Sequence, residues 1–222
     1  MYVPDAARRG LNVARKTKLE ALATRDAILD AAEQLFREHG VSRTSLQDIA
    51  AAAGLTRGAI YWHFQDKGDV FNAMMERATA PLEAQLTQGS ADGDADPLAH
   101  VHSLAMAPLR LTASDERTRN VFDIAMHKVE YVDELVAARD RHLAVYDRCL
   151  PSMEQALEAA IDQGRLSRAL APRASAIGMW AIVDGLLRVW LLNPQAFDLV
   201  AVGEQVVGVY LSGLGPAGQR AA

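Results

Sequence analysis

Side chains that donate hydrogen bonds are concentrated in one short stretch of this 222-residue chain, TRGAIYWHFQDK. Tyr61, Trp62 and His63 are consecutive there, so a single helix cannot bury all three and at least one must face outward. Ile60 and Phe64 stand one helical turn apart and are expected to face the core. Hydroxyl and aromatic polar groups on the other faces would suit phosphates, with the helix in the major groove. The residues left toward solvent or DNA are Thr56, Arg57, Gly58, Tyr61 and His63.

Apolar spacing and end signals predict the helices that would position these groups. The first is expected from Thr24 to Gly40, where glycine permits the left-handed backbone that ends a helix. The second follows Ser45, which forms a capping-box pattern with Asp48, and it ends at Gly54.

Two further helices follow along the chain. The third comprises RGAIYWHF with Thr56 as its cap, and the fourth runs from Asp66 toward Leu86. Two short helices joined by a turn of three or four residues containing glycine are the signature of a helix-turn-helix. The small Ala50 would let the second helix cross close to the first. The pattern favours a DNA-reading module, although a solvent-exposed helix hairpin inside an ordinary helical protein would give the same pattern.

Composition and charge are consistent with a small DNA-binding module joined to a larger domain. Half of the residues are hydrophobic, and no run of alternating β-branched residues is present, so an all-α fold is expected. Residues 1–67 hold ten Lys/Arg against eight Asp/Glu, whereas residues 68–222 hold thirteen against twenty. A mildly basic head on an acidic body fits this division of tasks, although random scatter would look similar.

The sequence also bears on where the protein works. Cys149 is the single cysteine, which excludes an intrachain disulfide and favours a reducing compartment. No apolar run follows the basic N-terminal residues, so no signal peptide is predicted. The most apolar stretch, around Ile177 to Leu192, is interrupted by Asp184 and Arg188 and is expected to be too short to span a bilayer. A cytoplasmic protein that does not use a membrane is expected.

The region from about Ala14 to Phe71 resembles the N-terminal domain of the TetR family of transcriptional repressors, most clearly in TRDAILDAAEQLFREHGVSRTSLQDIAAAAGLTRGAIYWHFQDKGDVF. ARKTK and, more thinly, DERTRNVFDIAMHKVEY and VDGLLRVWLLNPQAFDL resemble its multidrug-efflux branch, the AcrR/TtgR-like group. The resemblance implies an N-terminal three-helix helix-turn-helix domain, residues 14–67, and a C-terminal helical ligand-binding and dimerisation domain, residues 68–222. Residues 1–13 precede the resemblance and are expected to be disordered.

For the head, the resemblance implies a set of DNA contacts. Arg57 is expected to read a base, because its planar fork suits guanine in the major groove. Lys67, at the start of the fourth helix, is expected to hold a phosphate. Trp62 is expected to pack beneath the recognition helix rather than touch DNA. The other contacts are expected at Thr44 and Ser45 with phosphates, at Thr56 and Gly58 with base edges and backbone, and at Tyr61 and His63 with phosphates.

The rest of the chain carries no recognisable catalytic constellation, so an enzyme is not expected and no cofactor is implied. His100 and His102 are two residues apart, which on a helix places them on different faces. No metal site is therefore expected from them. Cys149 is expected to be a small packing residue rather than a nucleophile.

The body offers apolar and sulfur-containing side chains instead. Flexible methionines suit a cavity that accepts several shapes, although methionine in an ordinary core is the commoner case. Pro81, Pro108 and Pro151 lie inside expected helices and would bend or break them. In the TetR family the ligand cavity lies among helices four to eight. By that resemblance the lining residues are Met75, Ala78, Phe122, Met126, Cys149, Met153, Val183 and Arg188. Arg188 would pair with an acidic ligand or, equally well, with Asp184 one turn earlier.

The last two helices, roughly Pro172–Leu192 and Asp198–Leu214, are apolar around most of their circumference and need burial on several sides. In the family the equivalent pair packs against its copy in a four-helix dimer interface. A homodimer would also place two recognition helices in successive major grooves, about 34 Å apart on one face of the DNA. The operator is therefore expected to be an approximate palindrome.

Together these expectations describe a ligand-responsive repressor of multidrug efflux pump genes. It would leave its double-stranded operator when a small apolar or aromatic compound binds the body. Two alternatives stay open at this point. One is a TetR-family regulator of another pathway, such as lipid or amino-acid metabolism, with a dedicated ligand. The other is a helical protein that does not bind DNA and only shares the helix-turn-helix shape.

Overall fold

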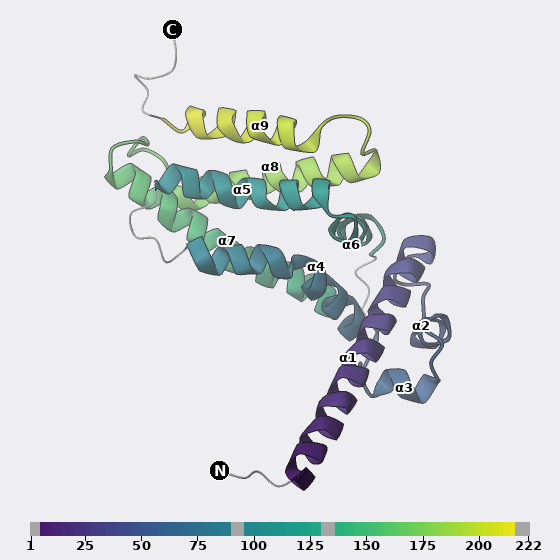
Figure 1. Ribbon diagram of the computed structural model, residues 1–222. Coiled ribbons are helices and arrows are strands. Elements are labelled where there is room, and N and C mark those ends of the chain that lie inside the picture. Colours follow the sequence, from purple (N-terminus) through teal and green to yellow (C-terminus); the bar gives the residue numbers. More distant parts are fainter. Residues whose placement is uncertain (1–4, 90–95, 130–135, 216–222) are drawn as a thin grey trace.

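The computed structural model describes the backbone of residues 5–89, 96–129 and 136–215, and the side chains of residues 18–82, 96–129 and 146–215. Within these residues the chain is helical and contains no strand, which confirms the all-α fold (Figure 1). The helices are α1 (Asp5–His39), α2 (Leu46–Ala52), α3 (Arg57–Tyr61), α4 (Lys67–Gly89), α5 (Pro97–Ser114), α6 (Glu116–His127), α7 (Val136–Asp162), α8 (Pro172–Leu192) and α9 (Leu199–Gly213).

The helix ends of the head follow the signals in the sequence. Gly40 ends α1 with a φ of 83°, in the left-handed region that favours glycine. Ser45 and Asp48 form the expected capping box at the start of α2. Thr56 caps α3, where its hydroxyl oxygen accepts a hydrogen bond from the amide of Ala59 at 3.3 Å. These local bonds fix the end of α1 and the starts of α2 and α3.

The first helix is longer than apolar spacing predicted. α1 begins at Asp5, so residues 5–13, expected to be disordered, continue the helix instead. Residues 5–23 consist largely of Ala, Arg, Lys and Leu, which have high helix propensity, and they contain no proline. This part of the helix has no regular apolar face, so apolar spacing does not predict it.

The core of the head, here called the head cluster, is built around the inner faces of α1 to α4. Its buried side chains include Phe36, Ile49 and Ile60. α6 adds Val121 and Ile124 to the same cluster, although it lies far away in sequence. The head is therefore packed against a helix of the body, and its core extends past the expected boundary at residue 67.

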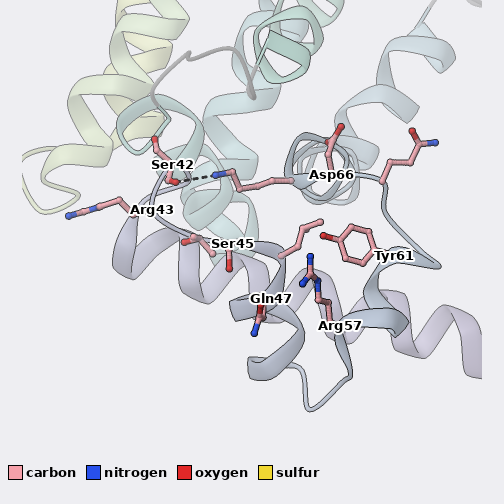
Figure 2. A pocket seen from close by; sticks show the side chains of 11 residues that line it. Ser42, Arg43, Ser45, Gln47, Arg57, Tyr61 and Asp66 are labelled. Atoms are coloured by element: carbon pink, nitrogen blue, oxygen red, sulfur yellow. Dashed lines mark hydrogen bonds between the residues drawn. The ribbon is translucent and has the colours of Figure 1, made fainter.

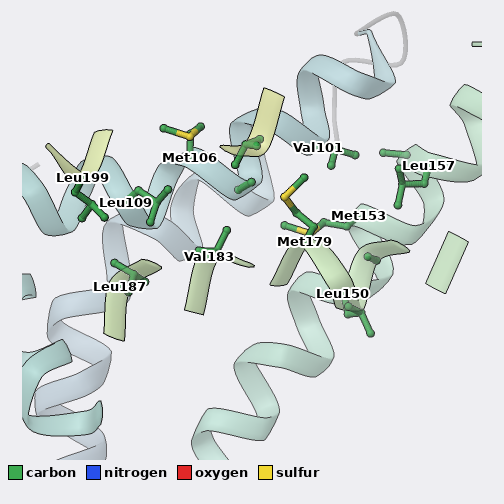
Figure 3. Close-up of a cluster of buried hydrophobic side chains, with 14 of the residues drawn as sticks. Val101, Met106, Leu109, Leu150, Met153, Leu157, Met179, Val183, Leu187 and Leu199 are labelled. Atoms are coloured by element: carbon green, nitrogen blue, oxygen red, sulfur yellow. The ribbon is translucent and has the colours of Figure 1, made fainter. Parts of the chain in front are cut away.

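The core of the body, here called the body cluster, joins α5, α7, α8 and α9 and is drawn in Figure 3. Its buried methionines are Met106, Met153 and Met179, which lie among leucine and valine side chains. Pro81, Pro108 and Pro151 are inside α4, α5 and α7, as expected.

Helices α8 and α9 have nearly the bounds that the sequence predicted. Contrary to the expectation from sequence, α8 is long and apolar enough to cross a membrane by length and composition, the one such helix among the described residues. It starts at Pro172 and reaches 21 residues, and although it carries three charges, Arg173, Asp184 and Arg188, an 18-residue stretch of it holds no more than two of them and stays apolar. Its buried residues belong to the body cluster, and this packing accounts for the apolar face toward α5, α7 and α9.

Helix α6 joins the body to the head (Figure 1). At its C-terminal end, the carbonyl oxygen of Lys128 accepts a hydrogen bond from the amide of Val41, in the turn after α1, at 3.1 Å. Near its start, the hydroxyl of Thr118 donates to the carbonyl oxygen of Ala78 in α4 at 3.4 Å. α6 is thus anchored to both long helices that carry the head cluster.

Opposite charges reinforce this junction. The Arg77 side chain of α4 is only 17% exposed, and its guanidinium lies 2.8 Å from the Asp30 carboxylate and 3.8 Å from those of Asp26 and Glu33. Arg117 of α6 also approaches Asp30, at 3.3 Å. These five residues, here called the junction network, connect α1, α4 and α6 through shared charges.

Replacing Arg77 by glutamine is expected to lower the free energy of unfolding by about 2 kcal/mol, because the carboxylates of α1 lose a largely buried cation. The matched control is Arg173→Gln, since Arg173 pairs with Glu154 at 3.1 Å but is 60% exposed. That change is expected to cost less than about 0.5 kcal/mol. Urea denaturation of both variants measures the difference, and equal losses would contradict a special role of the junction network.

Candidate DNA interface

An open groove of about 630 Å³ lies on the head, between the segment that leads into α2 and the segment that joins α3 to α4 (Figure 2). Its lining includes three cationic side chains from separate parts of the head, Arg43, Arg57 and Lys67. Asp66 is the one carboxylate among the lining residues, and it accepts a hydrogen bond from the amide of Asp69 at the start of α4. The groove is therefore electropositive and suited to an anion.

One wall of the groove is formed by α3. Arg57 lies in the first turn of this helix, and its guanidinium carbon is 5.9 Å from the centre of the Tyr61 ring. The cation thus stacks near an aromatic face, which orients the guanidinium without neutralising it. Figure 2 shows both side chains directed toward the α2 side of the groove. Tyr61 is about half exposed, so its phenol is accessible to a ligand.

The opposite wall is held by hydrogen bonds to the backbone. The ammonium group of Lys67 donates to the carbonyl oxygen of Ser42 at 3.1 Å (Figure 2). Hydrogen bonds from the hydroxyl and the amide of Ser45 hold the pKa of the Asp48 carboxyl below its ordinary value, so that the capping box stays ionised. The start of α4 is consequently fixed by Lys67 against the turn that leads into α2.

The structure brings four of the expected DNA contacts to this groove, namely Ser45, Arg57, Tyr61 and Lys67. Thr44 also borders the groove, but its side chain is only 3% exposed. Its hydroxyl donates to the carbonyl oxygen of Gly40 at 2.9 Å. The Thr44 hydroxyl therefore stabilises the turn after α1, and the expected contact of Thr44 with a phosphate stays a prediction.

The remaining expected contacts flank the groove. Thr56 and Gly58 are exposed at the start of α3, and a Cβ atom at Gly58 would meet nothing closer than 4.0 Å. His63 is half-buried, with its ring centre 6.4 Å from that of Phe64.

Trp62 departs most clearly from expectation. Its side chain is 90% exposed, so it does not pack beneath the recognition helix. Ile60 and Phe64 occupy the inner face, and Trp62, midway between them in sequence, is rotated by roughly 200° from Ile60. Because Ile60 and Phe64 are both buried in the head cluster, Trp62 is directed away from it.

Sequence reasoning missed several residues that line the groove. Arg43 and Gln47 come from the α2 side, and Ser42 and Gln65 come from the two connecting segments. A basic residue directly before Thr44 was the available signal. Their convergence depends on how α3 and α4 fold against α2, which helical spacing does not reveal.

Comparisons with known proteins identify the fold that carries this groove. Residues 28–74 match the bacterial regulatory proteins of the tetR family, and residues 96–216 match the C-terminal region of MAATS-type transcriptional repressors. The HTH-type transcriptional regulator AcrR of Shigella flexneri is 40% identical over 203 residues, which are 90% of this chain and 93% of AcrR. The chain belongs to the TetR family.

Two solved TetR-family structures are similar throughout. NalD, the secondary repressor of the MexAB-OprM multidrug efflux pump in Pseudomonas aeruginosa, is 36% identical with a TM-score of 0.82, covering 89% of this chain and 99% of NalD. SmeT, the repressor of the SmeDEF pump of Stenotrophomonas maltophilia, has been solved with triclosan. It is 34% identical with a TM-score of 0.77, covering 88% of this chain and 93% of SmeT. These relatives are transcriptional regulators.

Five of the eight ligand contacts expected from the TetR resemblance belong to the body cluster or pack against it. Phe122, Met153 and Val183 are buried in the body cluster, and Met75 and Met126 pack against it. They come from α4, α6, α7 and α8, so four helices contribute to one apolar region.

Three other expected ligand contacts lie outside the body cluster. Ala78 is buried in the head cluster, and Cys149 is half-buried on α7. Arg188 is half exposed, and its guanidinium donates to the carbonyl oxygen of Met126 at 3.0 Å. It also lies 3.8 Å from the carboxylate of Asp184. The ion pair within α8 is therefore present, and the contact of Arg188 with an acidic ligand stays a prediction.

The two neighbouring histidines have separate partners, as their spacing predicted. His100 lies 3.1 Å from the Ser152 hydroxyl, and His102 lies 2.8 Å from the Glu204 carboxylate. Within the described part of the chain, no three His, Cys, Asp or Glu side chains are grouped so that they could hold a metal ion.

Proposed function

We propose that this TetR-family chain is a ligand-responsive repressor of multidrug efflux pump genes, which acts in the cytoplasm as a homodimer on a palindromic operator. Residues 14–67 would supply the DNA-binding module and residues 68–222 the ligand-binding and dimerisation domain. The observation that carries the proposal is the groove, in which three cations and a phenol converge beside the recognition helix. The similarity to AcrR, NalD and SmeT supports efflux genes as the target.

Each groove residue has a role that follows from its chemistry. Arg57, at the start of α3, presents a planar fork that suits the O6 and N7 acceptors of guanine. Tyr61 would donate a hydrogen bond from its hydroxyl to a phosphate, and Arg43 and Lys67 would supply the charges that hold the DNA backbone. Ser45 would lie beside the same phosphates, with its own hydroxyl and amide donating to the Asp48 carboxylate. Phosphate contacts set the register of the head on the duplex, and the arginine then reads sequence. Thr56, Gly58 and His63 would contact the DNA at the edges of this site.

The direct test is fluorescence anisotropy of the purified full chain with labelled DNA from upstream of its own gene. Binding is expected to be sequence-selective against a scrambled duplex and to weaken steeply with salt, because phosphate contacts release counterions. Weak binding that is equal on both duplexes would contradict recognition of that DNA, and a selection from genomic fragments would then decide whether the protein has another operator or none.

Base and phosphate contacts are expected to respond differently to mutation. Arg57→Ala should weaken operator binding by about 10- to 100-fold and reduce discrimination against the scrambled duplex. Lys67→Met should weaken binding to both duplexes alike and reduce the slope of log affinity against log salt by about one. Anisotropy titrations measure both effects, with Arg173→Gln on the body as the control that should change neither. Equal behaviour of the Arg57 and Lys67 variants would contradict the assigned roles.

We infer that the effector is a small apolar or aromatic compound that binds where Met75, Phe122, Met126 and Val183 meet. The thioether and aromatic side chains support this chemistry, and Arg188 is already engaged with protein groups. The complex of SmeT with triclosan supports the same class of compound. A ligand at this place would displace α4 or α6, both anchored to the head through the junction network, and so alter the spacing of the two heads.

Filling this region is expected to separate effector binding from DNA binding. Val183→Phe should weaken the response to triclosan at least tenfold while operator affinity stays within about twofold, because the added volume lies in the body cluster. The control is Ala99→Phe, at an exposed position on α5. Triclosan titrations of the operator complex measure the response. A folded Val183→Phe protein that had lost operator binding would contradict this separation.

The homodimer is supported by apolar side chains that α8 and α9 leave exposed in the single chain. Ile177, Val189 and Leu192 of α8 and Val209 of α9 are all large and more than one third exposed. Such a patch marks an interaction surface, and two copies of this helix pair would cover each other.

Val209→Glu is expected to convert the protein to monomer at micromolar concentration and to reduce operator affinity, because a buried unpaired carboxylate opposes the interface. Sedimentation velocity measures the mass. Leu19→Glu is the control, since Leu19 is equally exposed but lies on α1. A Val209→Glu protein that remained dimeric would place the interface elsewhere.

A further inference from the structure

The exposure of Trp62 calls for a partner. At 90% it is the most exposed of the large hydrophobic side chains in the described part of the chain. An indole in water forgoes a large burial energy, and tryptophan is enriched at interfaces. Tyr61, next to it in sequence, and Arg57 on the same helix line the electropositive groove.

The direction of Trp62 is fixed by the residues around it on α3. Ile60 and Phe64 are buried in the head cluster, and Tyr61 faces the groove. Trp62 follows as the C-terminal cap of the helix, with helical backbone angles of −72° and −23°. It is therefore held on the outer side of the recognition helix, adjacent to the electropositive groove.

Gly58, one helical turn before Trp62, leaves this outer side open. A Cβ atom there would meet no atom closer than 4.0 Å, so the glycine is not required by packing within the head. Without a side chain at this position, a duplex can approach the α3 backbone closely. The indole of Trp62 then lies next to the place where the duplex comes closest to the α3 backbone.

The length of α3 places both of its ends within one major groove. Five residues rise about 7.5 Å, whereas the major groove is about 12 Å wide. Among the groups that bases present in this groove, the 5-methyl group of thymine is the apolar one. An exposed indole face is a suitable partner for this methyl group, because packing the two together removes apolar surface from water. The indole cannot accept a hydrogen bond from a base.

We infer that Trp62 packs against the 5-methyl group of a thymine in each half-site and is a specificity-determining residue for the operator. The inference rests on the proposed function, since it requires the head to bind duplex DNA. It adds a second base contact to that of Arg57, made by apolar packing rather than by hydrogen bonds. The operator half-site is accordingly expected to contain a thymine that cannot be replaced by uracil without loss.

The test replaces thymine by deoxyuridine, which removes only the methyl group, at one position of both half-sites at a time. Wild type, Trp62→Ala and Trp62→Phe are titrated against each duplex at one salt concentration. At one thymine position, the affinity of the wild type for the duplex should fall about fourfold for each methyl group removed, and so about sixteenfold when both half-sites carry uracil. Trp62→Ala should bind more weakly and no longer distinguish thymine from uracil there, and Trp62→Phe should keep part of the discrimination.

Each outcome separates this inference from the proposed function. If the wild type does not distinguish its operator from a scrambled duplex, the proposed function fails. If it does, but every thymine can be replaced without loss, the inference is wrong. It is equally wrong if Trp62→Ala keeps the wild-type sensitivity to uracil. Because Trp62 is so exposed, Trp62→Ala should have the same melting temperature as the wild type, and thermal denaturation checks this.

Discussion

The position of the DNA-binding head depends on how α6 is fixed between α1 and α4. Its C-terminal carbonyl oxygen at Lys128 holds the turn after α1, and its charged face shares the junction network with Arg77. The pair by which α6 joins this network, Arg117 with Asp30, is about half exposed and contributes a modest free energy, in addition to the hydrogen bonds that Lys128 and Thr118 make with Val41 and Ala78. The same helix contributes Phe122 and Met126 to the body cluster. A ligand in the body and DNA at the head would therefore act on one shared element.

The shape of the groove is fixed by hydrogen bonds that nearby side chains make within the head. Thr44 is tied to Gly40, Lys67 to Ser42, and Ser45 to Asp48. These bonds order the turns before DNA arrives, so that little entropy needs to be lost on binding. Arg57 and Trp62 are not held in this way, and they are the two side chains best placed to respond to base identity.

Much of the fold could be predicted from sequence because the signals are local. Gly40 and Thr56 mark helix ends through their own backbone and side-chain chemistry, and the limits of α8 follow from its apolar pattern. The features that the sequence does not reveal depend on contacts between residues that are distant in sequence. The burial of Thr44 and the exposure of Trp62 follow from how four helices meet, and the start of α1 follows from propensity without amphipathic spacing.

Hydrogen–deuterium exchange of the full-length protein with and without operator DNA tests the account most directly, because it reports on the head and on α6 together. The account predicts slower amide exchange in residues 41–47 and 56–67, which form the groove, and also in α6, which the junction network connects to it. Slower exchange confined to α5, α7, α8 and α9, with the groove segments unchanged, would contradict it.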